Sequence, residues 1–195
     1  MLPQPDALTH LPAPVDDGAA RHLPGSVLPG LAFDATDGTQ IRLDRTGSGR
    51  WILFIYPSTG RPGEPIPPGW NEIPGARGCS QEACSFRDGL GALQSHGIAR
   101  VLGLSSDVTV HQQALVERFQ LPYPLLSDPE LALAAALDLP TFMARNRRFY
   151  RRLTMIVDGA QIEHVFYPVF PPDSHVDEIL AWLSAQPAQP EAPSR

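Results

Sequence analysis

Cys79 and Cys84 carry the most reactive side chains of this chain and are its only thiols. Both lie where the sequence predicts the start of a helix. Five residues along an ideal helix separate two Cα atoms by about 8 to 9 Å, whereas a disulfide requires roughly 7 Å or less. We therefore expect the pair to stay apart while the helix is intact and to bond only after the helix unwinds locally.

Cys79 is the expected reactive thiol because it lies closest to the helix N-terminus. The field of a helix N-terminus and nearby arginines lower the pKa of a cysteine from its usual value of about 8.5. The thiolate is the form that peroxide oxidises to sulfenic acid, with which a second thiol condenses to a disulfide. We predict a lowered pKa for Cys79 and assign Cys84, where the field is weaker, as the second thiol.

A structural role of the cysteines stays open as an alternative, whereas a zinc site is disfavoured. Free cysteines are often small buried apolar residues, and the spacing alone does not exclude that role. A zinc site would need two further ligands, but the six histidines form no pair with metal-like spacing. We therefore expect neither a metal nor a cofactor.

The elements that position the cysteines begin with the apolar run at 51–57, which predicts a strand buried on both faces. Residues 58–78 are rich in Pro and Gly and predict a long loop. Apolar residues at helical spacing after Cys79 predict a helix, and Gly97 is its expected C-terminal stop.

The rest of the chain continues this alternation of strands and helices. The expected elements are strands at 99–106 and 123–128, helices at 109–120, 128–139 and 174–185, and hairpins at 28–44 and 153–169. Asp128 is the expected N-terminal cap of its helix. Together they predict an α/β fold with a mixed central sheet, helices on both faces and an N-terminal β-hairpin.

A single domain is expected from the length of 195 residues. We place it at 25–185, between a flexible N-terminal arm at 1–24 and a flexible C-terminal tail at 186–195. No apolar run approaches the ~20 residues that cross a bilayer, and the first residues lack the features of a secretory signal. We therefore expect a soluble, cytoplasmic protein that does not contact membranes.

The formal net charge of -6 argues against broad affinity for nucleic acids, which requires many basic groups to neutralise phosphates. The exception is RNRRFYRR at 145–152, which carries five of the 15 basic residues. We interpret this run as a solvated turn or an anion site. All the basic residues are Arg, so Schiff-base chemistry and a P-loop are excluded.

Three segments carry a family resemblance. They are GCSQEACSFRDGLGALQSHGIARVLGLSSD at 78–107, LPYPLLSDPELALAAALDL at 121–139 and RLTMIVDGAQI at 152–162. The first resembles the signature GCT-x-E-A-x-x-FRD, with a second Cys five residues on, of the peroxiredoxin Q or bacterioferritin comigratory protein group of AhpC/TSA-type redoxins. The resemblance runs from about residue 25 to 185 and implies a thioredoxin-like fold.

By this resemblance, Cys79 is the peroxidatic cysteine, Cys84 the resolving cysteine and Arg152 the arginine beside the sulfur, with Arg151 as the alternative. The implied activity is a thiol-dependent peroxidase that reduces hydrogen peroxide or organic hydroperoxides. It implies a sulfenic acid on Cys79, an intramolecular disulfide and recycling by thioredoxin or a similar thiol reductant. The expected assembly is a monomer or a homodimer.

The chain departs from the family pattern just ahead of Cys79. The family usually reads Tyr-Pro-x-x-x-Thr-Pro-Gly-Cys, but YPSTGRPG at 56–63 is followed by Glu64 in the place of the Cys. The inserted residues at 64–78 then precede Cys79, and Ala76 stands where the family has a Thr whose hydroxyl helps to bind peroxide.

Thr59 and Trp70 are the residues whose roles depend on this insertion. Either Thr59 folds back to supply the missing hydroxyl, or the site works without it. Trp70 would suit a pocket for a bulkier substrate, although a single Trp in a loop more often anchors the loop by burial.

Two further functions remain as alternatives to a peroxidase. One is thiol-disulfide exchange without peroxide, which the absence of a C-x-x-C motif disfavours. The other is a redox sensor or interaction module that changes its surface when the disulfide forms, with the apolar segment 165–172 as a candidate contact surface.

Overall fold

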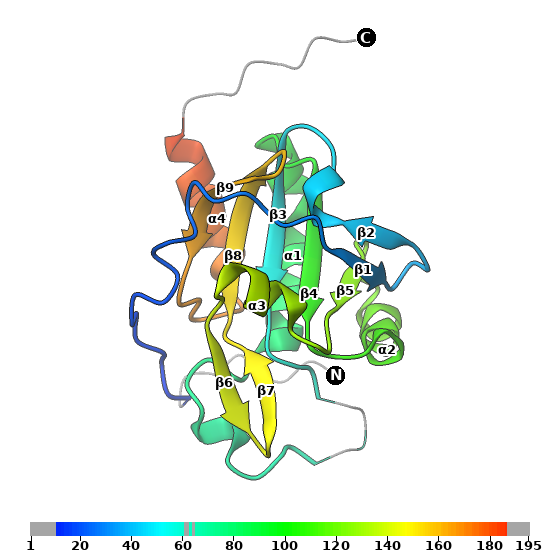
Figure 1. Cartoon of the computed structure of the whole chain (residues 1–195), viewed down its shortest axis with the longest axis vertical. Coiled ribbons are helices and arrows are strands. Elements are labelled where there is room, and N and C mark those ends of the chain that lie inside the picture. The colour runs from blue at the N-terminus through cyan, green and yellow to red at the C-terminus, as the bar shows by residue number, and fades with distance from the viewer. Residues whose placement is uncertain (1–10, 61–62, 64, 187–195) are drawn as a thin grey trace.

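The computed structural model describes residues 11–60, 63 and 65–186 (Figure 1). The strands of the main sheet in this part of the chain are β1 (Ala32–Ala35), β2 (Gln40–Arg42), β3 (Arg50–Ile55), β4 (Arg100–Ser105), β5 (Leu125–Ser127), β8 (Leu153–Asp158) and β9 (Gln161–Phe166). Their order is β2-β1-β5-β4-β3-β8-β9. β3, β4 and β5 run parallel, while the other neighbours are antiparallel. The predicted mixed sheet and N-terminal hairpin are therefore confirmed.

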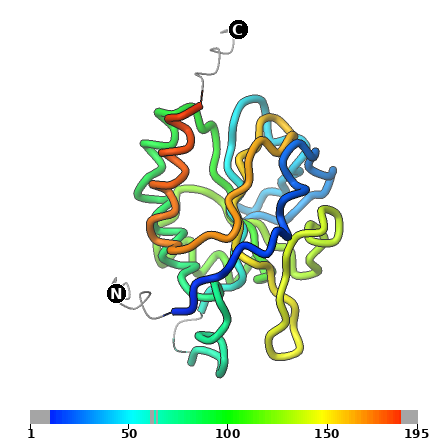
Figure 2. Tube along the Cα trace, turned by 90° about the vertical axis from the view of Figure 1, so that its left-hand side faces the viewer, coloured from blue at the N-terminus to red at the C-terminus, as the bar shows by residue number. Residues whose placement is uncertain are grey.

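The α-helices of the described residues cover both faces of this sheet. They are α1 (Cys79–Ser95), α2 (Thr109–Phe119), α3 (Ala132–Leu137) and α4 (His175–Ala185). α1, α2 and α4 pack on one face, and the short α3 packs on the other. Figure 2 shows α4 lying alongside α1. No helix in the described ranges is long and apolar enough to cross a membrane.

β3 is buried along its whole length, as its apolar run predicts. Its alternate side chains enter two separate cores because successive residues of a strand point to opposite faces. Phe54 stacks on Phe86 of α1 with ring centroids 4.5 Å apart. Leu53 and Ile55 point to the other face, where α3 packs. The central strand thereby fixes the position of α1 against the sheet.

Residues 20–23 of the N-terminal segment pack on the face that carries α3. Leu23 is completely buried there and Ala20 is almost so. The core thus extends ahead of the predicted domain start at residue 25. Residues 1–10 of the predicted arm and 187–195 of the predicted tail lie outside the described residues.

A second, two-stranded hairpin was not predicted from the sequence. It consists of β6 (Thr141–Ala144) and β7 (Arg147–Tyr150), and it contains most of the arginine-rich run. Arg145 and Asn146 form its tip with φ of 49° and 58°, so the expected turn is present but is flanked by strands. The exposed arginines obscure the apolar face of this hairpin, which consists of Phe142, Ala144 and Phe149.

Asp128 caps α3 from a greater distance than expected. Its carboxylate accepts hydrogen bonds from the backbone N–H groups of Ala132 and Leu133, each at 2.9 Å. The helix begins only at Ala132 because Leu131 adopts a left-handed φ of 56°. The capping role is confirmed, whereas the predicted helix at 128–139 is too long.

α1 and α4 approach each other most closely at Gly89. A Cβ atom at this position would lie 2.5 Å from Cγ1 of Val176, a β-branched side chain with little freedom to move. Gly91 lies two residues further along the same helix and would place a Cβ in open space. The contact between the two helices therefore requires glycine at one of these positions only.

This pair of glycines gives a matched test of the packing. We expect Gly91→Ala to raise the free energy of unfolding by about 0.5–1 kcal/mol, because alanine favours the helix. Gly89→Ala brings the same gain in helix propensity but overpacks the contact between α1 and α4. We therefore expect it to lower the free energy of unfolding by about 1 kcal/mol or more. Denaturant unfolding measures both, and equal stabilisation by the two substitutions would contradict the close approach.

Candidate active site

Cys79 is the first residue of α1, where the sequence places it. The preceding Gly78 has a left-handed φ of 96°, and a Cβ there would overlap Pro172, so both backbone and space require glycine. Cys79 and Cys84 are both free thiols, with 5% and 4% of their surface exposed. The intact helix keeps them apart, as their spacing predicts.

Arg152 brings its guanidinium directly to the sulfur. It lies just ahead of β8 and is almost completely buried. Its Nη2 donates to Sγ of Cys79 over 3.1 Å. The neighbouring Arg151 is only partly buried and acts electrostatically on Asp17 and Tyr167 instead. The structure thus places Arg152, not Arg151, at Cys79.

Glu82 is a member of the site that sequence reasoning did not assign. It is fully buried, and its Oε2 accepts a hydrogen bond from Nη1 of Arg152. Its Oε1 has no hydrogen-bond partner among the described residues. An acidic residue three positions after Cys79, on the buried face of an amphipathic helix, is the signal that identifies it.

The electrostatics of Cys79 differ from the sequence prediction. Burial raises the pKa of the thiol, the charge of Arg152 opposes that rise, and the charge of Glu82 adds to it. A hydrogen bond from the Ser58 backbone also lowers the pKa of Cys79. The sum of these effects is nevertheless a raised pKa. The predicted lowering was wrong because it counted the helix terminus and Arg152 but neither the burial nor the carboxylate that neutralises Arg152.

The charges of Arg152 and Glu82 are mutually dependent. Burial lowers the pKa of Arg152, but the charges of Cys79 and Glu82 raise it by more, so the guanidinium stays protonated. Burial raises the pKa of Glu82, and the charges of Arg152 and His175 oppose that rise. With Arg152 and Glu82 both charged, deprotonation of Cys79 leaves the buried group with a net negative charge.

Ser58 and Thr59 lie where β3 ends, next to the end of the parallel strand β4. Both bind the carboxylate of Asp107, which lies two residues beyond the end of β4. Ser58 donates from Oγ over 2.6 Å, and Thr59 donates from its backbone N–H over 2.9 Å. The Thr59 hydroxyl lies 3.3 Å from the same carboxylate. The structure therefore brings the backbone beside Thr59 to Cys79, while the hydroxyl itself is engaged by Asp107.

The loop ahead of Cys79 supplies further contacts. Arg152 Nη2 donates to the backbone carbonyls of Gly75 and Arg77 over 3.3 and 3.0 Å. The thiol of Cys79 lies 3.6 Å from the carbonyl oxygen of Ala76. A backbone carbonyl thus stands near the position where the family has a Thr side chain. Glu64 of the same insertion lies outside the described residues.

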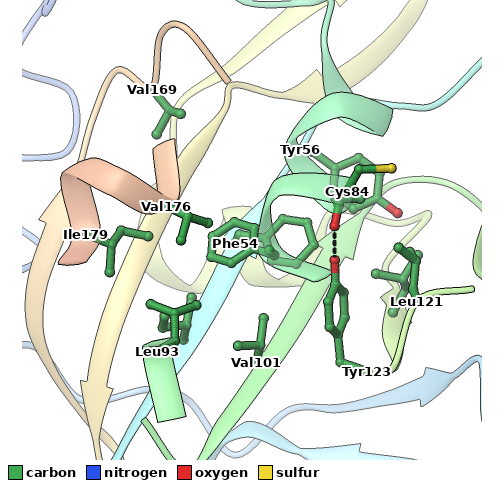
Figure 3. Packing of buried hydrophobic residues seen from close by; sticks show 14 of the residues in the cluster. Phe54, Tyr56, Cys84, Leu93, Val101, Leu121, Tyr123, Val169, Val176 and Ile179 are labelled. Carbon is green, nitrogen blue, oxygen red and sulfur yellow. Dashed lines mark hydrogen bonds between the residues drawn. The ribbon is translucent and has the colours of Figure 1, made fainter. Parts of the chain in front are cut away.

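Cys84 lies in the second turn of α1, among apolar side chains (Figure 3). Burial raises its pKa. Next to it, the hydroxyl of Tyr123 donates to the carbonyl oxygen of Ala83 over 2.5 Å, which secures this part of the helix. In the described residues, no three His, Cys, Asp or Glu side chains form a group that could hold a metal ion.

These features define a thiol protein with an α/β fold. Its sheet is mixed, and a buried arginine contacts a cysteine at the start of a helix. The chain matches the family model described as Redoxin over residues 23–180. The chain therefore belongs to the redoxin family.

Individual relatives agree with this assignment. The chain is 27% identical over 163 residues to peroxiredoxin Bcp of Escherichia coli, covering 82% of this chain and 94% of that protein. It is 26% identical over 162 residues to a putative peroxiredoxin bcp of Coxiella burnetii, covering 82% and 97% of the two chains. The resemblance to the bacterioferritin comigratory protein group is confirmed.

Solved structures give the same result for the fold. Peroxidoxin BcpB of Mycobacterium tuberculosis superposes with a TM-score of 0.66 at 27% identity, covering 84% of this chain and 98% of that one. Peroxiredoxin Q of Xanthomonas campestris superposes with a TM-score of 0.65 at 22% identity, covering 84% and 95%. The predicted thioredoxin-like fold is therefore confirmed.

The opposing effects on Cys79 predict how its reactivity depends on pH. In a protein that carries Cys84→Ser, we expect alkylation of Cys79 by neutral iodoacetamide to titrate above the pKa of free cysteine. Arg152→Lys keeps a positive charge but loses the fork of donors, so the midpoint should rise further, by about one pH unit. Arg151→Lys is the matched control and should leave it unchanged. A midpoint below that of free cysteine would restore the original sequence prediction.

Proposed function

We propose that this protein is a thiol-dependent peroxidase that reduces hydrogen peroxide or organic hydroperoxides at Cys79. The observation that carries the proposal is the hydrogen bond of 3.1 Å from Arg152 to the Cys79 sulfur. A guanidinium so placed can hold a thiolate and can donate to the oxygen on which negative charge develops. Membership of the redoxin family and likeness to proteins named peroxiredoxin support it.

The first chemical step takes place on Cys79. The thiolate attacks the terminal oxygen of the peroxide, so that an S–O bond forms while the O–O bond breaks. Sulfur is oxidised by two electrons to a sulfenic acid, and the leaving oxygen takes a proton to become alcohol or water. Arg152 stabilises the negative charge on that oxygen as the O–O bond breaks.

The second step joins the two cysteines. The sulfur of Cys84 attacks that of Cys79, so that an S–S bond forms, the S–O bond breaks and water leaves with the remaining proton. The helix must unwind for this step, because the intact helix separates the two sulfurs. Unwinding disrupts the hydrogen bond between Tyr123 and Ala83 and the ion pair of Glu82. A thioredoxin-like dithiol would then restore both thiols.

The proposal extends to the location and the assembly of the protein. A cytoplasmic location suits a chain whose two cysteines are unpaired, because reducing compartments keep thiols free. A monomer or homodimer remains the proposed assembly.

Substitution of each cysteine separates the two steps. Cys79→Ser should consume no peroxide, since serine is not oxidised. Cys84→Ser should consume one equivalent and then stop with a sulfenic acid on Cys79. Anaerobic titration with hydrogen peroxide and with cumene hydroperoxide, followed by mass analysis of the peptide containing residues 79–84, measures both outcomes. Equal activity of the two variants would refute the assignment, and oxidation without turnover would favour a redox sensor.

Thr59 is the proposed source of the hydroxyl that the family supplies from the position of Ala76. To act on peroxide, the hydroxyl would have to leave its contact with Asp107, which at 3.3 Å is a long hydrogen bond. The proximity of the Ser58 backbone to Cys79 supports this role.

We expect Thr59→Val to lower kcat/KM for hydrogen peroxide about tenfold, which corresponds to one lost hydrogen bond of about 1 kcal/mol or slightly more. Thr59→Ser keeps the hydroxyl and should stay near the wild-type value. Stopped-flow peroxide reduction measures the difference. Wild-type kinetics for Thr59→Val would show that the site works without this hydroxyl.

A further inference from the structure

The insertion ahead of Cys79 contacts Arg152 as well as the cysteine. Arg152 Nη2 has three acceptors within reach: the sulfur of Cys79 and the carbonyls of Gly75 and Arg77. Both carbonyls belong to the inserted residues. The insertion therefore contributes directly to the position of the guanidinium.

The pairing of Arg152 with Glu82 is incomplete in a way that these carbonyls explain. An arginine and a carboxylate prefer two parallel hydrogen bonds. Here only Nη1 of Arg152 and Oε2 of Glu82 are joined, while Nε and Oε1 are buried without partners among the described residues. The carbonyls of Gly75 and Arg77 hold Nη2 on the side of the sulfur. Without them, rotation of the guanidinium toward a two-point pair with Glu82 would remove Nη2 from Cys79.

Trp70 anchors the segment that carries the two carbonyls. Trp70 is 9% exposed and is the first residue of the short 3-10 helix Trp70–Glu72. Its ring lies edge-on to Phe149, with centroids 5.1 Å apart, and 5.8 Å from that of Phe142. These two aromatic rings belong to the β6–β7 hairpin. Trp70 thus packs against the hairpin instead of lining an open pocket.

The hairpin and Arg152 are continuous in sequence. β7 ends at Tyr150, two residues before Arg152. From Trp70 the chain continues through Ile73 to Ala76 by successive backbone hydrogen bonds of 3.4 and 3.1 Å. Trp70 therefore ties the segment that accepts hydrogen bonds from Arg152 to the hairpin that leads into Arg152.

We propose that the insertion is a brace for Arg152 and that Trp70 is a positioning residue of the reaction at Cys79. The packing of Trp70 on the hairpin keeps the Gly75 and Arg77 carbonyls in place, and these keep Arg152 on the sulfur. Only the effect on peroxide reduction rests on the proposed function. The effect on thiolate formation at Cys79 does not require that function.

The test compares Trp70→Ala with Trp70→Phe in protein that carries Cys84→Ser, so that one thiol titrates. We expect Trp70→Ala to raise the midpoint of iodoacetamide alkylation of Cys79 by about one pH unit, through the weakened hydrogen bond from Arg152. Trp70→Phe should return the midpoint to that of the parent. Trp182→Ala, which removes a partly buried Trp that stacks on His164, is the matched control and should leave the midpoint unchanged.

A midpoint unchanged by Trp70→Ala, with a lower melting temperature, would overturn the proposal, because Trp70 would then act in packing alone. If Trp70→Ala does not fold, Gly75→Ala tests the same brace. Gly75 has a left-handed φ of 76°, so alanine there strains the loop and displaces its carbonyl. The same upward shift is expected, and its absence would equally refute the brace. Failure of the proposed function would appear differently, as a wild-type protein that consumes no peroxide while the shift persists.

Discussion

The guanidinium of Arg152 is the buried cation that contacts both acids of the site. It binds the carboxylate of Glu82 through one nitrogen and the sulfur of Cys79 through another. Neither of these acids would be easily charged in this interior without it, because burial disfavours both anions. The architecture around Arg152 follows from this requirement. β8 starts just beyond it, α1 presents both acids from its first turn, and the inserted loop closes over it with carbonyl oxygens.

Sharing one cation between two acids sets the reactivity of the sulfur. Burial raises the pKa of Cys79 above its ordinary value, and a guanidinium that is also paired with Glu82 does not fully offset that rise. A thiolate of higher pKa is scarcer but more nucleophilic. Arg152 therefore has to stabilise the thiolate against both the burial of the sulfur and the charge of Glu82.

The sequence was most informative where periodicity and motif coincide. The helix was expected to begin close to Cys79, which is its first residue, and the strand at Leu153–Asp158 has the bounds of its apolar run. The β6–β7 hairpin was missed because its strands are only four residues long and its few apolar residues lie beside exposed arginines. The position of Glu82 on the buried face of α1 could be deduced from its spacing to Cys79, but its pairing with Arg152 and the carbonyls that Arg152 binds could not. These contacts depend on how segments far apart in the chain meet. Every residue has a backbone carbonyl, so the residue type does not indicate which carbonyl accepts a hydrogen bond.

Pro172 links the start of α1 to the turn before α4. It fills the space that Gly78 leaves open, so the turn before α4 rests on the residue that precedes Cys79. A first helical turn that unwinds to form the disulfide cannot keep this support in place. Disulfide formation at Cys79, of which only 5% is exposed, would then change the position of a surface segment next to α4. A reductant could distinguish the oxidised protein from the reduced one by the shape of that segment before it reaches either cysteine.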